Sequence, residues 1–294
     1  MTGPQGPAAL VAAEIPRAPR TRRTSVSRAY SAFRGVAVAL IIAVFLLPIV
    51  WMILASLKTN LDITDPEKLL SFSPTTENYA NVIQKQDFLP FIWNSFFIGA
   101  VSTVISLVLA VPAAWSMARF RMTRTTAGVL VARIIPGVSL LIPWYYVFAK
   151  LDLVGGYSGL ILSHMFVSLP LIVWIMLSFF ESSSIELEEA AQIDGLTAIG
   201  AFWYITLRLA TPGIATAGIL AFIFSWNNFL FALILSSDKT RTLPVAIFNF
   251  VSYASIDWGG LMAASVIITL PVMVIALFTQ RYIVAGLSAG ATKG

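Results

Sequence analysis

About six apolar stretches, each of 20 or more residues, constrain the fold of this chain more than any other feature. A helix is the form in which such a stretch crosses a bilayer, because it satisfies its own backbone hydrogen bonds where no water is present. We therefore expect an all-α membrane protein with about six transmembrane helices. The expected spans cover residues 33–57, 94–118, 126–149, 158–180, 212–235 and 259–283.

The composition is that of a chain that contacts lipid over much of its surface. Of the 294 residues, 58% are hydrophobic and only 11% are charged, whereas soluble domains carry roughly 25% charged residues. The net charge of +5 does not indicate nucleic-acid binding, because the basic residues lie in a polar tail and in short loops rather than on one folded face. The absence of cysteine excludes disulfides and thiolate metal sites, and we expect no metal site of another kind.

The distribution of Lys and Arg predicts which loops face the cytoplasm. Twelve of these residues lie in the N-terminal tail, in the loops after the second and fourth spans, and at the C-terminal end; six lie in the alternate loops, and Arg133 lies inside the third span. Because positively charged loops stay in the cytoplasm, both termini are expected there. Residues 58–93 and 236–258 then form extracytoplasmic loops.

The first 30 residues differ in composition from the rest of the chain. They are rich in Pro, Arg, Ala and Gly and have no apolar periodicity, so we expect a disordered cytoplasmic tail over residues 1–30 and a transmembrane domain over residues 31–294. A cleaved signal peptide is the alternative, because the small residues of Leu54-Ala55-Ser56 follow the first span. The long polar lead-in and the length of the first apolar stretch favour an uncleaved anchor.

The loop between the fourth and fifth spans, residues 181–211, departs from the charge rule. Five carboxylates precede its first basic residue, Arg208. The pattern predicts a helix, because Ser183 and Glu186 have capping-box spacing and Gly195 is suited to end the helix in a left-handed conformation. Two interpretations remain open: an amphipathic connector with a solvated acidic side, or a rigid element on which a partner docks.

The same loop resembles the EAA loop of ABC-importer permeases, and more narrowly that of the carbohydrate-uptake permeases of the maltose MalG type. The resemblance extends over nearly the whole chain after residue 30 and includes residues 225–228 and 280–294. Two positions depart from the family pattern: Leu196 replaces a small residue, and Arg208 stands where proline is common. The matching loop positions are Glu189, Ala190, Ala191, Asp194, Gly195, Phe202, Ile205, Leu207 and Pro212.

This resemblance implies a permease domain with a cytoplasmic EAA coupling helix, in a bacterial inner membrane. In such importers the subunit pairs with a second, MalF-like permease, two ATPase subunits bind on the cytoplasmic side, and an extracytoplasmic solute-binding protein delivers a sugar. Residues 184–195 would seat in a cleft of one ATPase and transmit its motion to the spans. The implied coupling residues are Glu189, Ala190, Ala191, Asp194, Gly195, Leu196 and Arg208.

ATP chemistry is expected on the partner subunits and not on this chain. The sequence has no G-x-x-x-x-G-K-[ST] loop that could hold phosphates. We therefore expect a transport subunit that is not an enzyme and binds no cofactor, with ATP and Mg held by the partners. A secondary transporter is the main alternative class, but it would need acidic residues inside the spans for ion coupling. An intramembrane enzyme would need a catalytic pair that the sequence does not offer.

Polar residues inside the spans are candidates for a solute path, because they are costly in lipid. Trp226, Asn227, Asn228 and Phe229 in the fifth span combine amides with aromatic faces, which suits a polyhydroxylated ring. An interhelical hydrogen bond is the alternative role of Asn227. The family points to a disaccharide, an oligosaccharide or a polyol as the solute, with a glycerophosphodiester as the alternative.

Two further polar residues are expected to have structural roles. Arg133 lies in the first part of the third span, from which its long side chain could reach the cytoplasmic headgroups. His164, in the fourth span, is expected to be a hydrogen-bonded structural residue and not a proton relay.

Overall fold

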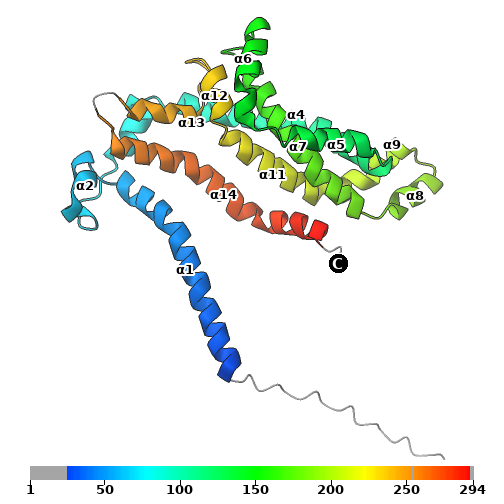
Figure 1. Ribbon diagram of the computed structural model, residues 1–294, viewed down its shortest axis with the longest axis horizontal. Helices are drawn as coiled ribbons and strands as arrows, with labels where there is room; N and C mark the ends of the chain where they lie inside the picture. The colour runs from blue at the N-terminus through cyan, green and yellow to red at the C-terminus, as the bar shows by residue number, and fades with distance from the viewer. Residues whose placement is uncertain (1–24, 253–254, 292–294) are drawn as a thin grey trace, which may run out of the picture. The chain divides into compact units, whose positions relative to one another are not determined.

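The computed structural model describes residues 25–252 and 255–291, and the side chains of residues 30–252 and 255–280 (Figure 1). The predicted tail over residues 1–30 lies mostly outside these ranges. The described part of the chain is a succession of helices with one isolated β-bridge, between Val251 and Ile256. The predicted all-α class is confirmed.

Helix α1 (Ser25–Ser56) is the first long apolar helix and contains Pro48. Its segment Tyr30–Ser56 is long and apolar enough to cross a membrane. Residues up to Val50 form a unit of their own, and Trp51 begins the second unit, which holds the remaining helices.

Three helices of the second unit pack into its principal core: α4 (Leu89–Arg119), α7 (Tyr157–Ser182) and α11 (Thr211–Trp226). Small residues let their backbones approach closely, as is usual where lipid supplies no hydrophobic driving force. At Gly213 the ring of Phe179 in α7 packs directly on the backbone of α11, because a Cβ atom there would lie 2.9 Å from Cδ2 of Phe179. Helix α14 (Trp258–Ala291) packs against α11 and contains Pro271.

The number of spans depends on two sharply bent helix pairs. Four described helices are each long enough to cross a membrane, and six spans result if each bent pair is one span. The expected third span is not one straight helix: α5 (Thr123–Ala132) and the segment 137–150, which holds η3 (Gly137–Leu140) and α6 (Leu141–Lys150), meet at 87°. The helix stops at this break because Pro136 supplies no N–H donor and disfavours helical backbone in the residue before it.

The fifth span also differs from the prediction of one helix over residues 212–235. Helix α11 ends at Trp226, and a separate short helix, α12 (Leu230–Leu235), follows it. On its other side, α11 bends by 73° from the helical segment 198–209. That segment consists of α9 (Ala198–Ala201), η4 (Phe202–Thr206) and α10 (Leu207–Leu209).

The two segments predicted to be extracytoplasmic carry short helices. Residues 58–93 include α2 (Asn60–Thr64), η1 (Pro66–Lys68), α3 (Glu77–Ala80) and η2 (Asn81–Lys85). Residues 236–258 include α13 (Leu243–Ala246) and η5 (Ile247–Phe250).

Hydrogen bonds hold these segments to the bundle. Asn94, inside α4, donates to the backbone carbonyls of Lys239 and Arg241 at 3.0 and 2.9 Å, and accepts a hydrogen bond from Tyr157 at 2.7 Å. In the first segment, the side-chain oxygen of Asn60 accepts from the N–H of Gly259 in α14 at 2.9 Å, while the fully buried Lys58 donates to the carbonyls of Lys68 and Leu69 within the segment.

Candidate functional site

The acidic loop begins with a short helix, α8 (Glu186–Ile193). Gly195 ends it with φ +99°, and the N–H of Leu196 returns to the carbonyl of Ala191 at 3.0 Å, as in a Schellman cap. The predicted end of the helix at Gly195 is confirmed. The predicted capping box is wrong: Ser183 ends α7, and the hydroxyl of Ser184 instead accepts from the N–H of Glu186 at 3.3 Å.

One carboxylate of α8 fixes the helix to the bundle. Glu188 is 5% exposed and accepts hydrogen bonds from Nη2 and Nε of Arg119, at 2.7 and 3.0 Å, through one carboxylate oxygen. Its other oxygen accepts from the indole N–H of Trp115 at 3.2 Å. Arg119 and Trp115 lie at the end of α4, so this ion pair joins the loop to a transmembrane helix.

Arg119 connects a third element to the same cluster. Its Nη1 donates to the carbonyl of Phe180, near the end of α7, at 2.9 Å. Trp115 also packs on Phe202 of η4, with ring centroids 4.8 Å apart. The ends of α4 and α7 and both helical parts of the loop therefore meet around one buried ion pair.

The surroundings of Glu188 keep its carboxylate ionised. Burial, the largest single influence, raises the pKa, but hydrogen bonds from Arg119, Thr206 and Trp115 together lower it, so the pKa lies below its usual value of 4.5. Glu188 is not among the coupling residues predicted from the sequence. The available signals were Arg119, directly after the second predicted span, and the helical spacing of Glu188 and Ala191, which share one face of α8.

The predicted coupling residues divide between the two faces of α8. Ala191 is buried, whereas Glu189 and Ala190 are exposed. Ile193, 86% exposed, adds a large apolar side chain to the surface of the same helix. Of the other predicted residues, Asp194, Gly195 and Arg208 are exposed and Leu196 is half-buried.

The polar group predicted in the fifth span lies at a helix break and not inside a continuous span. Asn227 ends α11 and donates to the carbonyl of Ile223 at 2.9 Å, a local bond that replaces the interhelical one considered as its alternative role. The side-chain oxygen of Asn228 accepts from the N–H of Phe231 at 3.3 Å and caps the start of α12. The side-chain amides thus satisfy backbone groups that the break leaves free.

The aromatic neighbours of these amides have different surroundings. Trp226 is buried, and its indole N–H donates to the carbonyl of Ile268 in α14 at 3.1 Å. Phe229 packs on Phe248, with centroids 5.7 Å apart. Trp226 is therefore part of the helix packing, while Asn227 is exposed.

A buried polar chain links three helices of the bundle. Nδ1 of His164 lies 2.6 Å from the hydroxyl oxygen of Ser225, which lies 3.2 Å from that of Ser102. These three residues belong to α7, α11 and α4. The predicted structural role of His164 agrees with this hydrogen bond.

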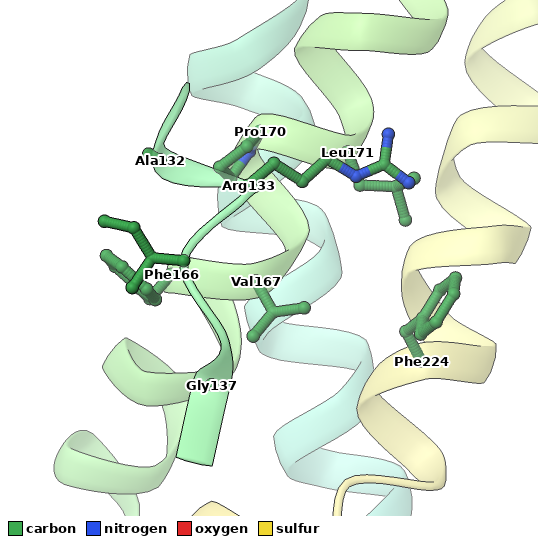
Figure 2. Close-up of a pocket in the computed structure, with 9 residues that line it drawn as sticks. Ala132, Arg133, Gly137, Phe166, Val167, Pro170, Leu171 and Phe224 are labelled. Atoms are coloured by element: carbon green, nitrogen blue, oxygen red, sulfur yellow. The ribbon is translucent and has the colours of Figure 1, made fainter. Parts of the chain in front are cut away.

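Arg133 ends α5 at the 87° break, where it lines a cavity of about 270 Å³ (Figure 2). Its guanidinium carbon lies 4.6 Å from the ring centroid of Trp174 in α7. The charge lies against this aromatic face, and the contact with headgroups expected from the sequence stays a prediction. The other lining residues come from the break and from α7 and α11: Ala132, Ile135, Gly137, Phe166, Val167, Pro170, Leu171 and Phe224.

Comparison with known proteins identifies this class of helical bundle. The chain belongs to the family of binding-protein-dependent transport system inner membrane components, which matches residues 93–289. It is thus a multi-pass membrane permease component of an ABC transporter, and the resemblance to carbohydrate-uptake permeases is confirmed.

Two relatives and one solved structure show how far the similarity extends. The trehalose transport system permease protein SugB of Mycobacterium tuberculosis is 38% identical over 261 residues, 87% of this chain and 95% of the relative. The sulfoquinovosyl glycerol transport system permease protein SmoH of Agrobacterium fabrum is 35% identical over 266 residues, 89% and 93% of the two chains. A chain of a bacterial ABC transporter that imports the acidic polysaccharide alginate shares the fold, with a TM-score of 0.76, 22% identity, and coverage of 88% and 98%.

Proposed function

We propose that this chain is the permease subunit of an ABC importer that brings a sugar into the cytoplasm, and that α8 receives the motion of a partner ATPase. The observation that carries the proposal is the division of α8 into two faces. Glu188 and Ala191 hold one face to the bundle, while Glu189, Ala190 and Ile193 are exposed on the other. A helix held in this way can move as a rigid unit and transmit the displacement of a partner to the spans.

The remaining parts of the importer follow from the same proposal. Both termini and the loop 181–211 lie in the cytoplasm, a second MalF-like permease completes the solute path, and two ATPase subunits hold ATP and Mg. An extracytoplasmic solute-binding protein supplies a disaccharide, an oligosaccharide or a polyol. The names of relatives that transport trehalose and sulfoquinovosyl glycerol support a sugar-like solute.

The coupling role is tested on the complete importer in proteoliposomes. Glu189→Lys reverses a charge on the exposed face of α8, and Gly195→Trp forces a side chain onto backbone with φ +99°. Both variants should insert normally yet lose ATPase co-purification, or hydrolyse ATP without uptake. The exposed Arg124, in the first turn of α5, provides a control in Arg124→Gln, which should behave as wild type. Normal, ATP-dependent uptake by both loop variants would show that α8 does not couple.

The solute is identified by thermal-shift screening of the solute-binding protein encoded beside this gene, with neutral and acidic sugars, polyols and glycerophosphodiesters. A sugar or polyol should raise the melting temperature. Stabilisation by a glycerophosphodiester alone would change the substrate class but not the coupling role of α8.

A further inference from the structure

Arg133 carries a charge at a depth where a lipid-facing position is unfavourable. The cavity that it lines contacts Phe166, Val167, Pro170 and Leu171, which lie in the middle of the 26-residue helix α7. The guanidinium itself lies over Trp174, eight residues before the end of α7 at Ser182, which is about 12 Å at 1.5 Å per residue. Charged residues at such depth face a bundle interior or a water-filled passage, because lipid does not solvate them.

The surroundings of Arg133 leave its hydrogen-bond donors available. Among the described residues, the ion pairs are Lys68–Asp62, Arg119–Glu188 and Arg241–Asp238, so no described carboxylate pairs with Arg133. The guanidinium carbon of Arg133 lies over the ring of Trp174, and no side-chain hydrogen bond joins Arg133 to another described residue. The side chain is exposed and extends over α7 from the break (Figure 2).

The rest of the cavity supplies apolar and aromatic surface. Phe166 is held edge-on by Trp144, with centroids 5.2 Å apart, and Phe224 of α11 is 53% exposed. A guanidinium with free N–H donors beside aromatic rings suits a sugar ring, whose hydroxyl or acidic oxygens accept hydrogen bonds and whose C–H groups pack on an aromatic face.

We propose that the cavity at the α5–α6 break is a solute-contact site of this subunit, in which Arg133 donates hydrogen bonds to oxygen atoms of the passing sugar. The inference rests on the proposed transport function and adds a residue-level site to it.

Cysteine labelling tests whether the cavity is part of a water-filled path, and the cysteine-free sequence makes single-cysteine variants directly usable. The variant Val167→Cys, in the complete importer in nanodiscs, should react with a charged methanethiosulfonate reagent in at least one nucleotide state. The matched control Val104→Cys, at an exposed apolar position of α4, should stay unreactive. No reaction of Val167→Cys with or without ATP would overturn the proposal.

Ligand protection tests for sugar contact. Trehalose and sulfoquinovosyl glycerol are added separately with the solute-binding protein, and at least one should slow the labelling of Val167→Cys. The variant Arg133→Gln should weaken this protection, and a loss confined to the sulfonated sugar would identify the acidic group as the partner of Arg133. Protection by neither sugar, or unchanged protection in the Arg133→Gln background, would overturn the proposed contact.

Uptake measurements separate this inference from the proposed function. With the sugar found by thermal-shift screening, Arg133→Gln should lower kcat/KM for uptake about tenfold or more, with ATPase assembly intact. Arg133→Lys should retain part of the activity. If the wild-type importer takes up sugar and Arg133→Gln has the same kinetics, the contact site alone is refuted. Loss of the assembled complex in Arg133→Gln would also refute it, because Arg133 would then be a subunit-interface residue. A wild-type complex that takes up no sugar would refute the proposed function and the contact site together.

Discussion

The buried pair of Glu188 and Arg119 predicts the largest effect of a single substitution in the coupling loop. Glu188→Ala removes the acceptor of two hydrogen bonds from Arg119 and one from Trp115. The guanidinium of Arg119, in a side chain 11% exposed, would keep its charge without a carboxylate partner. Breaking a buried pair from one side costs about 3–5 kcal/mol.

That free energy should appear as local undocking of α8. A loss of 3–5 kcal/mol corresponds to roughly a hundredfold to a few thousandfold increase in the undocked fraction. Hydrogen exchange, followed by mass spectrometry on the complex in nanodiscs, should show faster exchange of the amides of α8 and η4. The amides in the middle of α7 should be unaffected, because they lie away from the pair.

Two further variants make the measurement specific. Glu189→Ala changes the neighbouring but exposed carboxylate and should alter stability by no more than about 0.5 kcal/mol. The double variant Glu188→Leu with Arg119→Met removes both charges and should recover part of the protection, since no isolated charge stays buried. Equal exchange in Glu188→Ala and Glu189→Ala would refute the assigned role of the ion pair.

Three other predictions concern pH, backbone strain and topology. The pKa of Glu188 is lowered below 4.5 in the folded protein, so docking of α8 should be unchanged between pH 8 and about pH 5.5. Docking should weaken only below about pH 4.5, where the carboxylate becomes protonated, and hydrogen exchange would show this weakening. Gly195→Ala should destabilise α8 by about 1–2 kcal/mol because of its φ of +99°, whereas Gly128→Ala, inside α5 with open space around it, should be neutral or stabilising in the same thermal assay. Asp238→Cys, at a side chain 94% exposed, should react with an impermeant thiol reagent added outside intact cells, and Thr123→Cys should not. The reverse labelling pattern would contradict the predicted orientation.

The local features of this chain were readable from the sequence because they depend on neighbouring residues. Apolar length predicted the membrane-spanning helices 94–118, 158–180 and 259–283, which appear as α4, α7 and α14. The end of α8 at Gly195 was also predictable, since only the backbone of that residue has to adopt a positive φ.

Tertiary structure decided which polar side chains are buried and what they contact. Glu188 and Glu189 are adjacent and chemically identical, yet only Glu188 meets Arg119, which is 69 residues away in the chain. The helix breaks after Arg133 and at Asn227 and Asn228 divide the third and fifth stretches, each of which is apolar enough to be predicted as a single span. Apolar composition determines that a segment enters the membrane, but the packing of distant helices determines where it bends and which charges find a partner.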